Sequence, residues 1–376
     1  MPQNFLNQKN KILRKSETEF GEVISARALT DMNTAQDAEE IAGEGKYEDI
    51  IQKLRANGAL SSCVEKVRSA YGHRLALDNF VMTEHDFEML TVLGLYDMNT
   101  LEHSIRTFEI AYRIIARPLA EPSGETIIIG DYLRNAGVSL EQFLRAALFH
   151  DIGKVIIPRE ILHNALDDEE VLVRMFPEEN LKAGGQVKKE LLQTLYANGI
   201  RPIDVVPLKE IFKGEQYVKL LCDLEKRGFS ETATLKDVIR MHEPESRRIL
   251  TSLGYETEGE LAGSHHNYKK KAHSHLLNTP FGTFGVADLI RIADVTDALR
   301  SARWYKKPLS PLEALFVLVK DAEAGKIDSR LARLWVRDQY AELRKGDALL
   351  AAASGNGRQF ELQEEMRAIE MFLEKK

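Results

Sequence analysis

Histidine and aspartate residues recur in this chain with the types and order of metal ligands. The candidate set consists of His103, His150, Asp151, His242, His265, His266 and Asp294. Imidazole and carboxylate groups together bind Fe, Mn or Zn while leaving positions open for water, whereas thiolate-rich sets make closed structural sites. Five of the ten histidines belong to the set. The sequence therefore predicts a hydrolytic metal enzyme.

The adjacent pair His150-Asp151 lies at the centre of this prediction. Its carboxylate could bridge two metals about 3.5–4 Å apart, the separation typical of two-metal hydrolases. The pair closes the mostly apolar stretch 143–149, and burying both groups without a partner would cost several kcal/mol. Lys154 follows Asp151 by three residues, so on a helical turn its ammonium would reach the same side and neutralise a phosphate oxygen. We expect a phosphate ester as substrate.

A second His-Asp pair, His85-Asp86, is interpreted as structural. It follows Thr83 and Glu84 at an expected helix start, where acidic side chains favour the positive end of the helix dipole. No metal role is therefore expected for this pair.

Several segments together resemble the HD superfamily of metal-dependent phosphohydrolases, and most closely its HD-GYP branch of bacterial cyclic dinucleotide phosphodiesterases. The likeness extends over about residues 101–336. It is carried by Glu102-His103-Ser104-Ile105-Arg106, by Ala146-Ala147-Leu148-Phe149-His150-Asp151-Ile152-Gly153-Lys154, and by segments 240–250, 265–266, 291–299 and 301–311.

This resemblance implies a role for each candidate ligand. One metal would be held by His103, His150 and Asp294, and a second metal by the three remaining histidines, His242, His265 and His266. Asp151 would bridge the two ions, and Lys154 would contact the scissile phosphate, so these two residues are the candidate catalytic residues. The ions would be Fe or Mn, with Zn, Ni, Co and Mg as alternatives. Some family members bind a third metal through a glutamate four residues before the first histidine. Asn99 occupies that position here, so we expect two metal ions.

The chain departs from the HD-GYP pattern directly after His265-His266. It reads Asn-Tyr-Lys-Lys-Lys-Ala-His-Ser-His where the branch has an Asp-Gly-x-Gly-Tyr-Pro loop. Lys269, Lys270 and Lys271 would suit a polyanionic substrate, and the alternative is a solvated loop. Lys154 and Arg303 are further candidate substrate contacts. His273 and His275 are interpreted as surface residues.

Three functions remain open. The first is a two-metal phosphodiesterase that hydrolyses a cyclic dinucleotide such as cyclic di-GMP, which the resemblance would place in bacterial signalling. The second is an HD-type phosphohydrolase of a mononucleotide or another small phosphate ester, kept open by the missing loop. The third is a non-catalytic signalling or binding module, against which the complete ligand set argues.

The predicted fold class is all-α, an HD-domain helical bundle with metals between facing helices. Apolar stripes at helical spacing support it, and they consist of Ile105, Phe108, Tyr112 and Ile115, then Leu289, Ile292, Thr296 and Leu299. Asp297 shares a face with Asp294 and is interpreted as an anchor for Arg303 or Arg291, with a direct metal role as the alternative. The expected segments are a flexible N-terminus at 1–45, a helical N-terminal region at 46–95, a catalytic domain at 96–340 with an insertion at about 164–234, and a helical tail at 341–376.

Composition and charge exclude several classes of protein. The net charge of −7 gives no general case for nucleic-acid binding, and two cysteines exclude a disulfide scaffold. No apolar run approaches the roughly 20 residues that span a bilayer, and no secretory signal is expected at the N-terminus. We expect a cytoplasmic enzyme without a membrane span, and a homodimer remains an open alternative.

Overall fold

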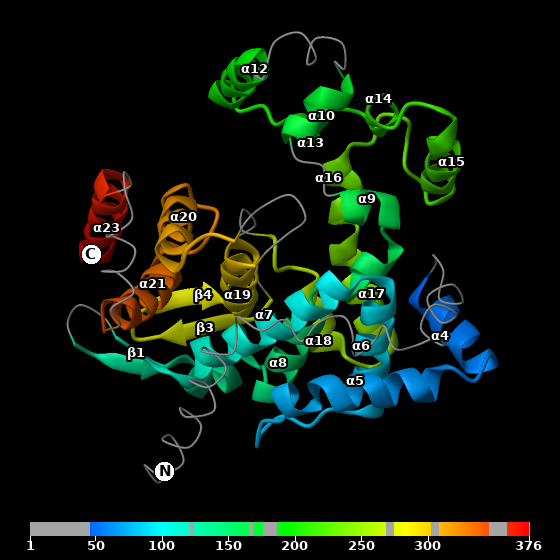
Figure 1. Ribbon diagram of the computed structural model, residues 1–376. Coiled ribbons are helices and arrows are strands. Elements are labelled where there is room, and N and C mark those ends of the chain that lie inside the picture. Colours follow the sequence, from blue (N-terminus) through cyan, green and yellow to red (C-terminus); the bar gives the residue numbers. More distant parts are fainter. Residues whose placement is uncertain are drawn as a thin grey trace.

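The computed structural model describes residues 46–120, 124–164, 168–175, 186–267, 274–301, 308–345 and 359–375. Helices dominate these ranges, and two small antiparallel sheets lie at the edge of the bundle (Figure 1). The prediction of an all-α fold is confirmed. The expected flexible N-terminus at 1–45 lies outside the described residues.

Three helices form the N-terminal region, and they are α4 (Tyr47–Ala56), α5 (Leu60–Leu75) and α6 (Glu84–Tyr96). A capping box starts α6, because the Thr83 hydroxyl accepts the Asp86 N–H while the Asp86 carboxylate accepts the Thr83 N–H. The pair His85-Asp86 is therefore structural, as expected. Buried residues of these helices share one hydrophobic core with the rest of the bundle, so this region has no separate core.

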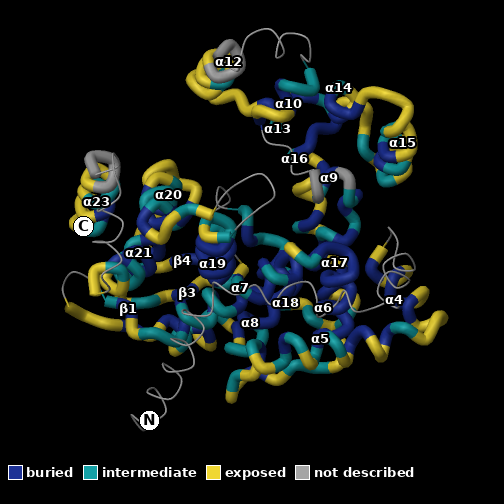
Figure 2. The backbone as a smooth tube through the Cα atoms, in the orientation of Figure 1, coloured by how far each residue is buried: buried dark blue, intermediate teal, exposed yellow. Residues whose placement is uncertain are grey.

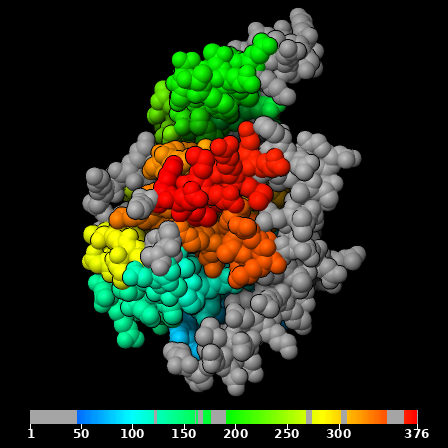
Figure 3. Space-filling model, turned by 90° about the vertical axis from the view of Figure 1, so that its left-hand side faces the viewer, coloured from blue at the N-terminus to red at the C-terminus, as the bar shows by residue number. Residues whose placement is uncertain are grey.

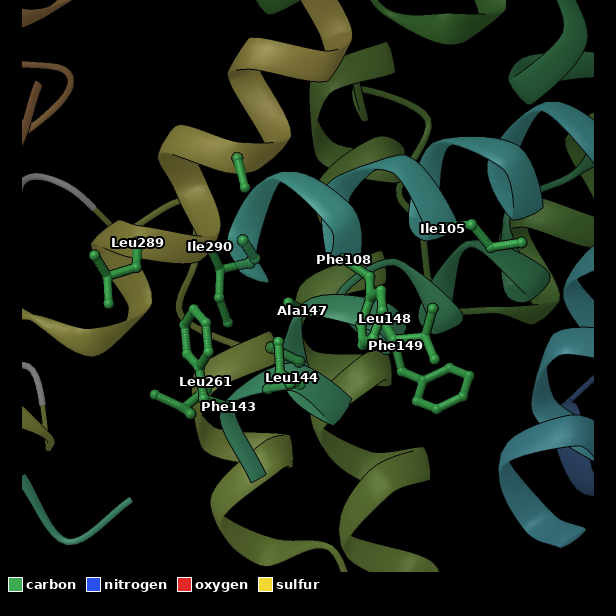
Figure 4. Close-up of a cluster of buried hydrophobic side chains, with 14 of the residues drawn as sticks. Ile105, Phe108, Phe143, Leu144, Ala147, Leu148, Phe149, Leu261, Leu289 and Ile290 are labelled. Atoms are coloured by element: carbon green, nitrogen blue, oxygen red, sulfur yellow. The ribbon is translucent and has the colours of Figure 1, made fainter. Parts of the chain in front are cut away.

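The centre of the bundle is built from α7 (Met98–Ala116), α8 (Leu140–Phe149), α17 (His242–Ser252), α18 (Glu256–Ala262) and α19 (Val286–Arg300). Their apolar faces interlock, with Phe108 of α7, Phe143 of α8, Leu261 of α18 and Ile290 of α19 buried in one cluster (Figure 4). Figure 2 shows buried residues gathered along α8, α17 and α19. The stripes expected on α7 and α19 thus face this core.

Short elements connect these helices. They are β1 (Pro118–Ala120), β2 (Thr126–Ile128), the 3-10 helices η1 (Ile129–Ala136) and η2 (Ile152–Ile156), β3 (Leu276–Thr279) and β4 (Gly282–Gly285). In the first sheet Leu119 pairs with Ile127, and in the second Leu277 pairs with Phe284. Strand β4 continues directly into α19, whose first turn is capped by Asp288 accepting the Gly285 N–H at 2.9 Å. This hairpin therefore sets where α19 begins.

Three C-terminal helices complete the body, and they are α20 (Pro311–Glu323), α21 (Ser329–Lys345) and α23 (Gln359–Glu374). Ile369 and Phe372 of α23 are buried in the main core, and the space-filling view shows α23 lying over α20 and α21 (Figure 3). The helix expected in the tail at 341–376 thus packs on the bundle, and α21 continues past residue 340.

The insertion stands off from the bundle as a helical unit (Figure 1). Its helices are α9 (Arg159–Asn164), α10 (Asp168–Met175), α12 (Gln186–Ala197), α13 (Pro202–Val205), α14 (Leu208–Ile211), η3 (Glu215–Tyr217), α15 (Val218–Lys226) and α16 (Leu235–Arg240). A second hydrophobic core lies inside it, running from Ile157 to Val238. This core extends beyond the expected bounds of 164–234 at both ends.

Candidate metal centre

The seven expected ligands lie together in the centre of the bundle. His103 comes from α7, His150 and Asp151 from the end of α8, His242 from the start of α17, His265 and His266 from the turn after α18, and Asp294 from α19. Three groups of described side chains each place three ligand atoms within 4.8 Å of one another. Two of them share no residue, and they are His103 with His150 and Asp294, and His242 with His265 and His266. The third, His150 with Asp151 and His265, connects these two groups.

Asp151 lies between these two groups. Its Oδ2 is 3.4 Å from His103 Nε2 and 3.3 Å from His150 Nε2. Its Oδ1 faces the other way and is 3.4 Å from His242 Nε2. The carboxylate is 2 % exposed. Each oxygen is thus directed at a different group of histidines, which is the arrangement that a bridging carboxylate needs.

Three of the histidines aim an unpartnered nitrogen into the cluster. Their Nδ1 atoms bond to backbone carbonyls three residues earlier, at 2.9 Å for His150, 2.6 Å for His242 and 2.5 Å for His265. A carbonyl only accepts, so Nδ1 carries the proton and the neutral ring presents a lone pair at Nε2. These three buried Nε2 atoms have no hydrogen-bond partner in the described structure. Divalent metal ions fit this donor set.

Helix ends position the same three histidines. His150 directly follows α8, His242 lies two residues beyond the end of α16, and His265 lies three residues beyond the end of α18. The last turn of a helix leaves carbonyls without intrahelical donors, and these carbonyls hold the rings. The negative ends of the helix dipoles favour nearby cations as well.

The electrostatics keep most of the ligands deprotonated. Burial lowers the pKa of His242 and His265, and lowers that of His266 to about 3. Burial alone would raise the pKa of Asp151, but Lys154 and the neighbouring histidines outweigh it and hold that pKa well below its usual range. Metal ligands must be deprotonated to bind, so little proton release opposes binding at these residues.

His103 differs from the other histidines. Burial lowers its pKa, but hydrogen bonds to Asp294 and Asp297 outweigh burial and raise it to about 9. Its Nε2 lies 3.1 Å from Asp294 Oδ1, and its Nδ1 lies 2.7 Å from Asp297 Oδ2. The ring therefore sits between two carboxylates, and a cation at its Nε2 would take the place of the proton.

Lys154 reaches the cluster from the turn that follows Asp151. Its Nζ lies 2.5 Å from Asp151 Oδ2, so the expected placement on the same side as the carboxylate is observed. The turn is η2, and α17 packs closely against it. A Cβ built on Gly153 would lie 2.1 Å from the His242 carbonyl oxygen. Glycine is therefore required at position 153, where the backbone of α17 at His242 lies against η2.

Two residues at the site were not singled out from the sequence. Ser246 of α17 donates its hydroxyl to the His150 carbonyl at 2.8 Å and accepts the Gly153 N–H at 2.9 Å. Arg106 of α7 donates to Asp297. The spacing of Arg106 three residues after His103 would have signalled a shared helix face, whereas nothing local marks Ser246.

One of the two expected partners of Asp297 needs correction. Its carboxylate accepts from His103 Nδ1, from Arg106 Nε at 2.7 Å, and from the Ser301 hydroxyl at 2.9 Å. Arg291 instead donates to the Lys326 carbonyl at 2.8 Å, and Arg303 lies outside the described residues. Arg106 reaches Asp297 because α7 packs along α19, a pairing that the sequence does not reveal.

Some candidate residues lie outside the described ranges, and they are Lys269, Lys270, Lys271, His273 and Arg303. His275 is described, and the interpretation as a surface residue is wrong. Its side chain is largely buried, with Nδ1 3.0 Å from the Ala136 carbonyl oxygen and Nε2 3.3 Å from Glu260. Because these contacts join η1 to α18, the residue has a structural role.

Comparison with known protein families adds to this geometry. A family model described as HD domain matches residues 100–225. Residues 100–225 are therefore similar to HD domains. HD domains are metal-dependent hydrolases in general, so the resemblance is confirmed at that level and supports phosphohydrolase activity in general terms. The match includes His103, His150 and Asp151 but ends before His242, so the other candidate ligands, His242, His265, His266 and Asp294, rest on the geometry above.

No curated protein and no solved structure matches the chain significantly. None of the helices in the described ranges combines the length and apolar character that crossing a bilayer requires.

Proposed function

We propose that this HD domain is a two-metal phosphodiesterase whose substrate is a cyclic dinucleotide. One observation carries the two-metal part, namely that the two oxygens of Asp151 face separate groups of ligand atoms. A single-metal site would need only one such group. The substrate part rests on the resemblance of the ligand segments to the HD-GYP branch.

Seven side chains are proposed to hold the ions. The first position takes His103, His150 and Asp294, the second takes His242, His265 and His266, and Asp151 serves both. The mixed nitrogen and oxygen set suits Fe or Mn, with Zn, Ni, Co and Mg as alternatives. When bound, a pair of divalent ions lowers the pKa of water towards neutrality and withdraws charge from phosphate oxygens.

Lys154 is proposed to bind the substrate phosphate. Its ammonium lies 2.5 Å from Asp151 Oδ2, and its side chain is 19 % exposed, so the group is held at the edge of the cluster rather than sealed inside it. A fixed cation there stabilises negative charge that grows on a phosphate oxygen in the transition state. Asp151 orients the ammonium through the same contact.

The missing Asp-Gly-x-Gly-Tyr-Pro loop favours a second candidate, a phosphohydrolase of a mononucleotide or another small phosphate ester. In the branch this loop forms part of the substrate pocket, and here residues 268–273 are outside the described ranges. Lys269, Lys270, Lys271 and Arg303 remain candidate contacts for a polyanionic substrate.

A metal measurement coupled to a hydrolysis screen tests the proposal. Protein purified with reductant and supplied with Fe²⁺ or Mn²⁺ should bind two ions per chain, measured by elemental mass spectrometry. It should hydrolyse cyclic di-GMP or a related cyclic dinucleotide faster than p-nitrophenyl phosphate. Preference for the monoester would select the second candidate, and binding of no metal would refute both. The Asp151→Asn variant is the control for contaminating hydrolases.

A further inference from the structure

Among the described candidate ligands, His103 has its Nδ1 directed at a carboxylate, whereas His266 Nδ1 lies 3.3 Å from the Arg291 guanidinium. His150, His242 and His265 donate Nδ1–H to backbone carbonyls, which no side-chain substitution removes. His103 instead places Nδ1 2.7 Å from the Asp297 carboxylate. The contact at His103 Nδ1 therefore depends on a side chain from another helix.

Asp297 is itself held firmly. The Arg106 guanidinium donates Nε to Oδ1 at 2.7 Å and Nη2 to Oδ2 at 3.3 Å, so the contact is bidentate. The Ser301 hydroxyl adds a bond to Oδ1 at 2.9 Å. The carboxylate is 3 % exposed. Bidentate arginine contacts fix the plane of a carboxylate, and here that plane sets which oxygen His103 meets.

Arg106 is constrained from its other side as well. Its Nη1 lies 3.6 Å from Glu102 Oε2, and Glu102 accepts the Tyr71 hydroxyl at 2.7 Å and Arg74 Nη1 at 3.3 Å. Tyr71 and Arg74 belong to α5. The chain of contacts that ends at His103 therefore begins in the N-terminal region.

We infer that Asp297, aligned by Arg106, is a positioning residue that holds His103 as the Nδ1–H tautomer with Nε2 facing Asp151 and Asp294. It thereby controls metal binding at the position formed by His103, His150 and Asp294, and leaves the position of His242, His265 and His266 unaffected. The inference rests on the proposed two-metal site. Partners of this kind typically change metal affinity by about 10–100-fold.

Asparagine at position 297 separates this role from a purely structural one. Arginine only donates hydrogen bonds, so the amide oxygen of the Asp297→Asn side chain should turn towards Arg106. The amide NH₂ then faces His103 Nδ1. That group donates, so it forces the proton of the ring onto Nε2, where the metal should bind. If Asp297 acts by fixing the His103 tautomer, the nearly isosteric Asp297→Asn variant should lose at least as much metal affinity as the Asp297→Ala variant. A structural role predicts that Asn is milder than Ala in every measurement.

The experiment compares Asp297→Asn, Asp297→Ala and Arg106→Ala with the wild type. The measured quantities are the number of Mn²⁺ ions bound, their dissociation constants from competition with a chelator, and the melting temperature of the metal-free protein. Asp297→Asn and Asp297→Ala should keep one tightly bound ion and bind the other about 10–100-fold more weakly. Binding in Asp297→Asn should be at least as weak as in Asp297→Ala. Arg106→Ala should show a smaller loss at the same ion.

Asp86→Asn is the matched control. Asp86 is also a buried carboxylate held by an arginine, with Arg145 Nε at 3.0 Å, but it contacts no candidate ligand. The Asp86→Asn variant should have a lower melting temperature than the wild type and should retain both ions. Wild-type affinity for both ions in Asp297→Asn would overturn the inference while leaving the two-metal proposal intact. Two ions in the wild type without hydrolysis of any phosphate ester would overturn the proposed function alone.

Discussion

The Ser246 hydroxyl joins α17 to the turn that follows α8, donating to the His150 carbonyl at 2.8 Å. The same oxygen accepts the Gly153 N–H at 2.9 Å. Ser246 is fully buried, and its helix begins with His242. One side chain therefore fixes the relative position of two segments that supply candidate ligands to both metal positions.

Replacing Ser246 by alanine should weaken both stability and metal binding. The buried Gly153 N–H would lose its acceptor, at a cost of about 1–3 kcal/mol. The expected results are a lower urea midpoint and weaker binding of both ions, measured by chelator competition. Ser252→Ala on the same helix is the control, because the Ser252 hydroxyl bonds to the Ile249 carbonyl of its own helix. Equal behaviour of the two variants would contradict a joining role for Ser246.

Gly153→Ala tests how closely α17 must approach η2, the turn that follows Asp151. A Cβ there would lie 2.1 Å from the His242 carbonyl oxygen and 2.5 Å from the Ser246 nitrogen. Backbone atoms cannot move aside independently, so α17 should shift and carry His242 with it. We expect loss of the ion held by His242, His265 and His266, measured as metal stoichiometry.

The matched glycine is Gly72 on α5, where an added Cβ meets nothing closer than 3.9 Å. Gly72→Ala should retain both ions and be neutral or slightly stabilising, since alanine favours helix by up to about 1 kcal/mol. Full metal binding in Gly153→Ala would show that the approach of α17 is not needed for the site.

Asp151→Ala and Lys154→Ala should fail in different ways. Removing the carboxylate that faces both groups should abolish turnover and most metal binding. Removing the ammonium should leave two ions bound and lower kcat, because a fixed cation contributes most in the transition state. Metal analysis and kinetics on the same samples distinguish the two outcomes. Lys209→Ala is the control, because Lys209 forms an exposed ion pair with Glu231. Wild-type turnover in Lys154→Ala would remove Lys154 from the mechanism.

Asp168→Asn should disturb the insertion without disturbing the metals. Its buried carboxylate accepts from the Tyr196 hydroxyl, Arg201 Nε and the Ile203 N–H, each at 3.0 Å. Loss of this charge weakens bonds that organise α10, α12 and α13, so limited proteolysis should become faster within the insertion. Metal stoichiometry should stay at the wild-type value, because the insertion has its own core.

The comparison for Asp168 is Asp204→Asn, which removes a partly exposed ion pair with Lys236. Such pairs contribute about 0–1 kcal/mol, so proteolysis should change little. Loss of metal in Asp168→Asn would show that the insertion supports the site, contrary to the expectation from two separate cores.

Local sequence was sufficient to predict the helical fold class and to select the seven ligand-type residues. Apolar residues at steps of three and four specify which face of a helix is buried, as at Ile105 and Phe108. A capping residue such as Thr83 marks a helix start. His150-Asp151 could be identified because the pair closes the mostly apolar stretch 143–149, where burying both groups without a partner would be costly. These signals all act within a few residues along the chain.

Only the tertiary structure decided how the ligands face one another. Asp297 and His103 are 194 positions apart, and Ser246 and His150 are 96 apart. Such contacts depend on how α7, α8, α17 and α19 pack, and packing follows the summed fit of many side chains rather than any local propensity. For the same reason the contact between Arg106 and Asp297, and the separate core of the insertion, could be seen only once the helices were assembled.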